Sequence, residues 1–285
     1  MPISADDVRT LHKYDIRILR ALERLMKRYM WVPDDILRHA TKLSESELDY
    51  RLGHLMAKNL VKSSSLPYKG YQMVFAGFDA LALQSLTKKG SVRALGSLLG
   101  VGKESDVYEA MGFGAVVLKF HRVGQRSFQS VRLNRGYMPE YKHAPWIFVS
   151  SLSAQREFEA LNALESAINV PHPIDRNRNV IVMSEIQGLT LSQCTLEHPQ
   201  EALDQIMKQV IAAYRLGYIH GDLSEFNIMA DGEEIWIIDW PQWIEPDHPN
   251  AETILRRDLN NVITFFARKY GTSLTTEEAY ELVIG

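Results

Sequence analysis

The most informative stretch of this sequence is HGDLSEFN, residues 220–227. It directly follows a predicted helix and matches H-x-D-x-x-x-x-N, the catalytic loop of phosphotransferases. In such a loop Asp222 would orient a nucleophilic hydroxyl and accept its proton, and Asn227 would hold a metal ion. The alternative is a solvated loop that contains one Asp and one Asn by chance, and the eight-residue match argues against it.

A second carboxylate follows in the apolar stretch EIWIIDW, residues 234–240. This pattern predicts a buried strand, and Asp239 stands near its end. A carboxylate at that place is a natural Mg²⁺ ligand that also approaches the phosphates of ATP, although it could instead only cap the strand. We therefore pair Asp239 with Asn227 as predicted metal ligands.

Two features nearer the N-terminus point to nucleotide phosphates. The segment GVGKESDV, residues 100–107, lies between two predicted strands, and its glycines would let the backbone approach phosphate oxygens. Lys119 lies in the apolar strand VVLKF, where burial without an anionic partner is costly, so we expect it to contact the α- and β-phosphates. Each feature taken alone has an ordinary alternative. The segment 100–107 could be only a hairpin turn, and Lys119 could face the solvent. The loop residues predicted to contact the nucleotide are Gly102, Lys103, Glu104, Ser105 and Val107.

Supporting residues are expected on a helix and on a strand between these segments. Glu157 lies in the predicted helix 154–166 and could fix the position of Lys119, with Glu159 as a competing choice. At the end of the predicted strand NVIVMSE, the backbone of Glu185 and of the following Ile186 could hydrogen-bond adenine, with Met183 lining the pocket or belonging only to the core. The predicted ATP site therefore combines six segments of the chain.

Residues 1–85 predict a separate winged helix-turn-helix domain. Apolar residues recur on one helical face, and Ser44 with Glu47 has the pattern of a capping box at a helix start. The expected elements are helices at 18–29, 34–39 and 44–56, strands at 60–63 and 71–75, and a linking helix to about residue 90. A small helical bundle of another kind is the alternative.

The composition excludes several classes of protein. The chain has 285 residues, 46% of them hydrophobic and 24% charged, which is typical of a folded globular protein. Cys194 is its only cysteine, and no apolar run approaches the ~18 residues of a membrane span. We therefore expect a cytoplasmic protein with no disulfide and no membrane partner. The net charge of −3 is uneven, because residues 1–90 carry 15 Lys and Arg against 10 Asp and Glu.

Together these motifs resemble the RIO family of kinase-like proteins. The resemblance is strongest to its second subfamily, the branch that carries an N-terminal winged helix. The stretches that carry it are GKESDVY (102–108), VVLKF (116–120), RSFQSVR (126–132), AQREFEALNAL (154–164), HGDLSEFN (220–227), IIDWPQW (237–243), and HPNA with RRDL (248–259). They cover most of residues 90–260.

The resemblance implies an α+β fold in which a bilobal protein-kinase-like domain with a truncated C-lobe follows the winged helix. The kinase domain would span residues 91–285, with the N-lobe at 91–185 and the C-lobe at 186–285. It also implies a serine/threonine kinase or ATPase that uses ATP with Mg²⁺ (or Mn²⁺) in maturation of the small ribosomal subunit. The expected partners are therefore the precursor of that subunit and its rRNA.

The resemblance also assigns roles to single residues. Asp222 is the expected catalytic aspartate, and Lys119 contacts phosphate. Asp239 holds metal with Asn227 and could itself accept a phosphoryl group. Ser127 matches an autophosphorylated position, although it could equally be an ordinary surface serine.

Departures from ordinary protein kinases favour a nucleotide-driven switch. Gly221 replaces the Arg of H-R-D, no A-P-E follows Asp239, and the short remainder implies a truncated C-lobe. The segment 121–145 is basic and is expected to face rRNA or to cover the active site, unless it is simply a polar loop. Its cations are Arg122, Arg126, Arg132, Arg135 and Lys142, against the single acid Glu140.

Two other functions remain open. A small-molecule phosphotransferase of the aminoglycoside or choline kinase type shares the H-G-D and I-D-W motifs, but it lacks a winged helix. A nucleotide-sensing regulator that binds nucleic acid is the other alternative. Sequence-specific DNA binding is not expected, because the predicted recognition helix 44–56 begins with several acids that would oppose insertion beside phosphates.

Overall fold

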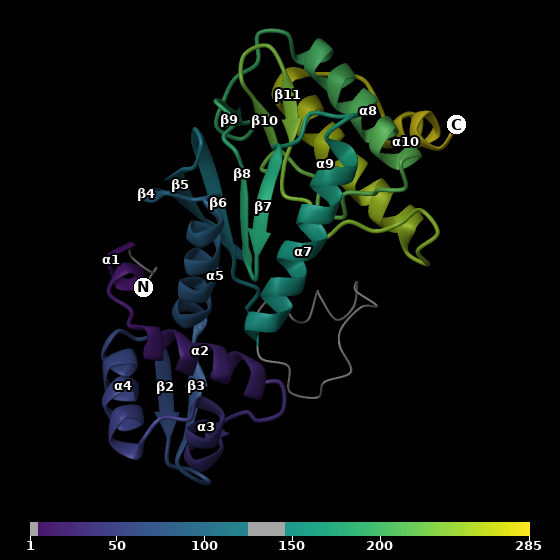
Figure 1. The fold of residues 1–285 in the computed structure, drawn as a ribbon. Helices are drawn as coiled ribbons and strands as arrows, with labels where there is room; N and C mark the ends of the chain where they lie inside the picture. The colour runs from purple at the N-terminus through teal and green to yellow at the C-terminus, as the bar shows by residue number, and fades with distance from the viewer. Residues whose placement is uncertain (1–4, 125–145) are drawn as a thin grey trace. The chain divides into compact units, whose positions relative to one another are not determined.

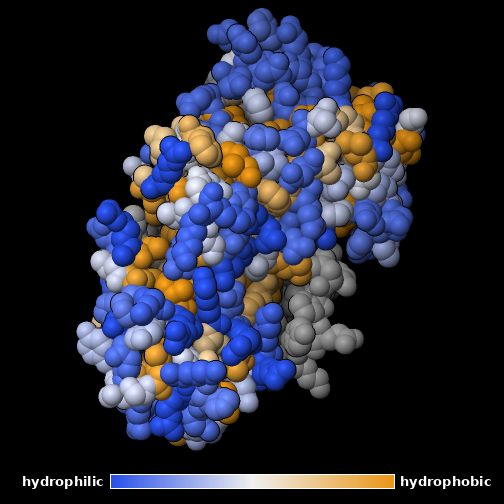
Figure 2. Space-filling model, in the orientation of Figure 1, coloured by the Kyte–Doolittle hydropathy of each residue, from blue (hydrophilic) through white to orange (hydrophobic). Residues whose placement is uncertain are grey.

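The computed structural model describes residues 5–124 and 146–285, which form two compact units (Figure 1). The first unit comprises the chain up to Ala154 together with residues 174–182, and the second comprises residues 155–173 and 183–285. On the face drawn in Figure 2, hydrophilic side chains predominate and apolar ones occur in small groups. None of the helices within these described ranges is both long and apolar enough to span a bilayer.

The first unit begins with helices and a small sheet in the order expected of a winged helix. The elements are α1 (Ala5–Arg9), α2 (Lys13–Leu25), β1 (Val32–Pro33), α3 (Asp34–Thr41), α4 (Glu45–Ala57), β2 (Val61–Ser64), β3 (Gly70–Met73) and α5 (Phe75–Lys89). The sheet has the order β1-β3-β2. The two-residue strand β1 was not expected, because a pair of residues ending in proline carries no alternation of polarity.

Capping interactions fix the boundaries of these helices. The Ser44 side chain accepts a hydrogen bond from the Glu47 amide at 3.3 Å, as predicted for the start of α4. The predicted reciprocal bond of the capping box is wrong, because the Glu47 carboxylate instead accepts from Arg51 Nε at 2.7 Å. At the other end of the domain, α5 terminates at Gly90, whose φ of 84° is in the left-handed region.

A five-stranded sheet completes the first unit. Its order is β4-β5-β6-β8-β7. The strands are β4 (Ala94–Val101), β5 (Ser105–Met111), β6 (Ala115–His121), β7 (Pro173–Asn177) and β8 (Val180–Ser184). Buried residues of α2 and α5 and of this sheet, such as Leu22, Phe78 and Phe120, belong to one continuous apolar core. The winged-helix elements and the sheet are therefore held together by shared burial.

Helix α7 (Trp146–Leu164) begins eight residues before the helix predicted at 154–166. No helical period in the sequence predicts these first eight residues. The first turn of α7 is instead stabilised by a small apolar cluster, in which Val149 and Trp146 pack with Val123. That contact joins parts of the chain far apart in sequence, so local periodicity could not reveal it.

The second unit contains helices and a small antiparallel sheet. Its elements are β9 (Leu189–Thr190), α8 (Pro199–Arg215), β10 (Ile228–Ala230), β11 (Ile235–Ile237), α9 (Ala251–Tyr270) and α10 (Thr276–Ile284). The sheet order is β11-β10-β9, and α10, which was not predicted, packs on α8 and α9. The strand expected over 234–240 is shorter than predicted, because the backbone leaves the sheet after Ile237.

Candidate active site

The catalytic-loop motif is built around a glycine that no other residue could replace without strain. Gly221 has a φ of 82°, a conformation that L side chains rarely adopt. A Cβ added there would collide with the backbone carbonyl oxygen of Gln242. The departure from H-R-D is therefore a steric requirement of this loop, which passes directly against the segment that follows Asp239.

Helix α9 holds the backbone of the same loop. Gly221 N donates to Asp258 Oδ2 at 2.7 Å, and the Leu223 amide is a further hydrogen-bond donor to this carboxylate. Arg257 Nη2 donates to the carbonyl oxygen of Gly221 and, at 3.1 Å, to Asp258 Oδ1. The two neighbouring side chains of α9 therefore bind both the donor and the acceptor of the Gly221 backbone.

Burial raises the pKa of Asp258 to about 6, against an ordinary value of 3.8. Only 2% of Asp258 is exposed, so water stabilises its charged form poorly. The Arg257 guanidinium and the two backbone amides act in the opposite direction without offsetting burial. Asp258 is thus a titratable group directly beneath the catalytic loop.

Asp222 and Asn227 are connected within the loop. The Asn227 side-chain amide donates to the Asp222 carbonyl oxygen at 2.8 Å. The Asp222 carboxylate is exposed and receives a long hydrogen bond of 3.4 Å from Gln242 Nε2. The Asn227 side chain therefore holds the backbone of Asp222, whose carboxylate lies at the surface.

A second set of bonds joins Asp239 to the catalytic loop. Ile238 N, directly before Asp239, donates to the Asn227 carbonyl oxygen at 2.9 Å. His220 Nε2 lies 2.9 Å from the Ile238 carbonyl oxygen, and the His220 ring packs on Trp240 with centroids 4.5 Å apart. Asp239 itself has a φ of 67°, a strained conformation for a non-glycine residue that is common at functional sites. The catalytic loop and residues 238–240 are therefore joined by hydrogen bonds and by ring packing.

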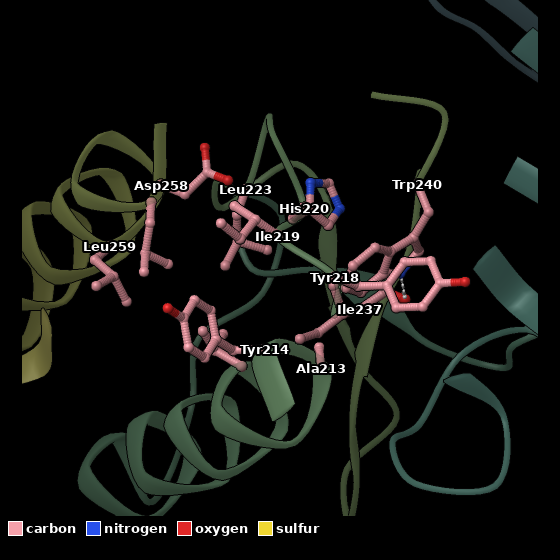
Figure 3. Close-up of a pocket in the computed structure, with 12 residues that line it drawn as sticks. Ala213, Tyr214, Tyr218, Ile219, His220, Leu223, Ile237, Trp240, Asp258 and Leu259 are labelled. Atoms are coloured by element: carbon pink, nitrogen blue, oxygen red, sulfur yellow. Dashed lines mark hydrogen bonds between the residues drawn. The ribbon is translucent and has the colours of Figure 1, made fainter. Parts of the chain in front are cut away.

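The pocket in Figure 3 lies beneath these motifs and is lined by residues such as His220, Asp258, Tyr214 and Trp240. It holds only about 10 Å³, roughly the space of one water molecule. A nucleotide cannot enter a space of that size. The pocket is therefore a packing gap under the catalytic loop.

The glycine-rich segment and Lys119 belong to the first unit. Gly102 N donates to the Ser105 carbonyl oxygen at 2.7 Å, which closes a tight turn between β4 and β5. Lys119 is directly opposite Val107 in the β5–β6 ladder, and such partners share a face of the sheet. Lys119 is only 6% exposed. The ladder thus brings the lysine next to the end of the glycine-rich segment.

The remaining predicted site residues lie in α7, in β8 and directly after β8, and one lies outside the described residues. Glu157 is 1% exposed in α7, and Met183 is 7% exposed in β8. Glu185 and Ile186 follow β8 and are half-buried. Ser127 lies outside the described residues, as does the segment 125–145 as a whole.

Sequence reasoning missed the supporting residues of α9. RRDL contributed only to the family resemblance, without a role for Arg257 or Asp258. A pattern in the sequence could have identified Asp258, because it lies on the buried helical face with Leu255, Leu259 and Val262. A charged residue on an apolar face requires a specific partner.

Within residues 5–124 and 146–285, no three or more His, Cys, Asp or Glu side chains cluster as a metal cage. Mg²⁺ commonly takes only one or two protein carboxylates and completes its shell with phosphates and water. The residue types of Asp239 and Asn227 fit a site of that kind. The Asn227 amide nitrogen donates to the Asp222 carbonyl oxygen, so its amide oxygen would be the ligand atom.

Comparisons with known proteins agree across the chain. The family described as "RIO domain" matches residues 106–279, and "Rio2, N-terminal" matches residues 8–89. A "RIO-type serine/threonine-protein kinase Rio2" of Methanocaldococcus jannaschii is 42% identical over 86% of this chain and 93% of its own length. "Serine/threonine-protein kinase rio2" of Dictyostelium discoideum is 36% identical over 95% of this chain, which spans about half (53%) of that longer protein.

A solved structure extends the agreement to the fold. The "Rio2 kinase-ADP/Mg2+-phosphoaspartate complex from Chaetomium thermophilum" superimposes with a TM-score of 0.83 and 31% identity, over 99% of this chain and 89% of that one. The kinase-like fold with an N-terminal winged helix, expected from the sequence, is thereby confirmed. The chain belongs to the RIO family of serine/threonine-protein kinases, in the branch that carries the Rio2 N-terminal domain.

Proposed function

We propose that this kinase transfers the γ-phosphoryl group of Mg²⁺-bound ATP with Asp222, Asn227 and Asp239 as its central residues. The observation that carries the proposal is the pair of bonds that meet at Asn227. Its side chain binds the Asp222 carbonyl oxygen, and its own carbonyl oxygen accepts from Ile238, the residue before Asp239. These hydrogen bonds thus connect the exposed Asp222 to Asn227 and to the backbone next to Asp239, the two proposed metal ligands.

The remaining predicted site residues supply the nucleotide contacts in this proposal. The closed turn at Gly102 presents backbone amides to phosphates, and Lys119 binds the α- and β-phosphates. Glu157 pairs with Lys119, since a carboxylate with 1% exposure needs a cationic partner. Glu185 and Ile186 bind adenine through their backbone beside Met183. The related solved structure from Chaetomium is an ADP/Mg²⁺ complex, which supports the same ligands here.

Two acceptors are chemically consistent with the site. For a serine or threonine hydroxyl, Asp222 accepts the proton while the oxygen bonds to the γ-phosphorus and ADP departs. For the Asp239 carboxylate, no proton has to be removed, because the attacking oxygen is already anionic. Bound Mg²⁺ would neutralise charge on the phosphates. The phosphoaspartate of the Chaetomium complex supports Asp239 as an acceptor, and Ser127 is the proposed site of autophosphorylation.

We further propose that the kinase acts in the cytoplasm on the precursor of the small ribosomal subunit, with rRNA as a partner. The support is its family branch and the excess of cations in residues 1–90. In this proposal the winged-helix domain, 1–85 with a linker to about 90, docks the enzyme, and the kinase domain, 91–285, switches with the nucleotide state.

Labelling with radioactive γ-phosphate ATP and Mg²⁺ tests the chemistry. We expect two kinds of label on the protein, one released by hydroxylamine, as an acyl phosphate is, and one stable to it. Asp239→Asn should abolish the first, and Ser127→Ala should reduce the second while leaving the first. A hydroxylamine-sensitive label that persists in Asp239→Asn would contradict the assignment of Asp239. For the ribosomal role, immature small subunits should stimulate ATP turnover more than mature ones.

A further inference from the structure

A row of exposed cations follows one face of α2 in the winged-helix domain. Lys13, Arg17, Arg20 and Arg24 are spaced by four, three and four residues, which places them on one side of the helix. The row extends about 16 Å along the helix axis. These side chains border a surface groove of about 340 Å³ whose lining also includes Ala40 of α3. We call this face, defined by the four cations, the α2 basic face.

The charge of this face is not compensated by acids. None of its four cations forms an ion pair with a carboxylate of the described residues; Arg17 donates instead to the Thr41 carbonyl oxygen and Arg20 to Gln84 Oε1, both at 3.3 Å. The acids of α2 are engaged elsewhere. Asp15 is fully buried and accepts from the His12 amide, and Glu23 pairs with Arg178 at 2.8 Å.

By contrast, several other arginines of the first unit are paired with acids. Arg51 pairs with Glu47 at 2.7 Å, and Arg38 pairs with Glu45 at 3.0 Å. Arg122 was counted from sequence among the cations expected to face rRNA, but it is bound to two aspartates inside the unit. The α2 basic face therefore retains its positive charge for a ligand.

The usual recognition helix of this domain type is unsuited to a polyanion. Helix α4 exposes Glu45 and Asp49 along its N-terminal half, and its Glu47 is tied to Arg51. Glu45 pairs with Arg38 and Asp49 pairs with Lys69, so the cations next to this half of α4 are already compensated and attract phosphates less. The charge pattern of the domain therefore favours α2, not α4, as the side that meets a nucleic acid.

From this pattern we infer that the α2 basic face binds the backbone phosphates of an RNA helix without reading its sequence. Arginine suits this ligand, because its planar guanidinium can bind two phosphate oxygens at once. A membrane surface is disfavoured, since α2 exposes no large apolar side chain that could enter a bilayer. The inference rests on the proposed ribosomal role, which it deepens by naming the contact surface.

The test is binding of the full-length protein to a fluorescein-labelled 20-base-pair RNA duplex, measured by anisotropy at several salt concentrations. The variant combines Arg17→Gln, Arg20→Gln and Arg24→Gln. Its matched control combines three exposed cations of the second unit: Lys208→Gln, Arg215→Gln and Arg268→Gln. The α2 variant should bind at least about tenfold more weakly. The slope of its log affinity against log salt concentration should be smaller in magnitude by about two to three. The control should change less than about twofold.

Two further measurements separate loss of contact from loss of fold. Replacing the same three arginines with lysine keeps the charge and should restore most of the affinity. The glutamine variant should retain autophosphorylation at the wild-type rate, because α2 contributes nothing to the proposed chemistry. A glutamine variant that binds the duplex as wild type does would overturn the inference.

The remaining outcomes are also decisive. If the glutamine variant binds naked RNA normally but fails on immature small subunits, the face contacts a protein and the inference is wrong. If wild-type protein binds immature subunits while the glutamine variant binds them equally well, only the inference fails. If wild-type protein does not bind immature subunits at all, the proposed ribosomal role fails with it.

Discussion

Arg122 and Asp79 form a bidentate ion pair that links the end of β6 to helix α5. Arg122 Nη1 and Nη2 lie 2.8 and 2.7 Å from the two Asp79 carboxylate oxygens, and Arg122 Nε lies 3.0 Å from Asp106. The Arg122 amide also donates to the Glu104 carbonyl oxygen at 2.6 Å. One residue thus connects the helix of the N-terminal domain to the glycine-rich segment.

Replacing Arg122 by Met should lower the free energy of unfolding by about 3–5 kcal/mol, because it leaves the Asp79 carboxylate, 1% exposed, without its cation. Burial lowers the pKa of Arg122, but Asp79 and Asp106 outweigh burial and hold that pKa above its ordinary value. Urea unfolding of the full chain measures the loss. Arg38→Met removes an exposed pair with Glu45 and should cost at most about 1 kcal/mol.

The double variant with Asp79→Leu and Arg122→Met provides the second arm of this experiment. It should be more stable than Arg122→Met alone, because it removes the isolated charge together with its partner. Equal destabilisation of the single and double variants would show that lost packing, not the uncompensated carboxylate, dominates.

Gly221→Ala should reduce phosphate transfer strongly, because its Cβ collides with the Gln242 backbone and displaces the loop that carries Asp222. Gly217→Ala is the matched control. Gly217 has a similar φ of 89°, but nothing lies within 4 Å of its added Cβ. The control should therefore lose only about 1 kcal/mol in its free energy of unfolding, the cost of placing alanine in the left-handed conformation. Its turnover should stay near normal. Similar turnover in the two variants would refute the steric argument.

Stability should depend on pH through Asp258. Its pKa is about 6 in the folded chain and near 3.8 when exposed, so between these values the folded state binds the extra proton. Its contribution therefore becomes less favourable as pH rises from about 4 to 6, by about 3 kcal/mol in total, and is constant above that window. Asp258→Asn lacks this titration. The difference in unfolding free energy between the variant and wild type should accordingly shift in favour of the variant across pH 4–6, and a constant difference would exclude the raised pKa.

Asp222→Asn should lower the rate of phosphate transfer by about 10²–10⁴-fold, the usual contribution of a general base, while ATP affinity stays within about twofold. The asparagine keeps the backbone carbonyl that Asn227 binds, so the loop should persist. Glu233→Gln, an exposed carboxylate in the turn before β11, is the control and should leave turnover unchanged. Single-turnover transfer and nucleotide titration measure the two quantities. An equal loss of binding and rate would argue for a structural role.

Local patterns were sufficient for the elements whose stability comes from their own residues. The Ser44 cap is confirmed, and the linking helix that was expected to reach about residue 90 ends at Gly90, after a basic last turn. The short apolar runs before and after the glycine-rich segment form the predicted antiparallel strands. These features depend on interactions within a few residues.

Patterns failed where a distant part of the chain supplies the stabilising contact. The early start of α7 depends on Val123, and the two-residue strand β1 exists because Val32 pairs with Tyr71. Arg122 belongs to a basic segment that was expected to face rRNA or to cover the active site, yet it pairs with Asp79, which lies 43 positions away in the sequence. Charge counted along a sequence does not reveal which charges are already paired.

The sequence by itself determined the family, the main elements of the winged-helix domain and the residue types of the candidate site, because a catalytic loop or a helix cap is encoded by side chains at fixed local spacing. The tertiary structure alone decided that Gly221 must be glycine, that Asp258 and Arg257 hold its backbone, and that the cations of α2 remain without acid partners among the described residues. Each of these facts concerns groups distant in sequence and within a few ångströms in space. Steric overlap, desolvation and ion pairing depend on that distance in space.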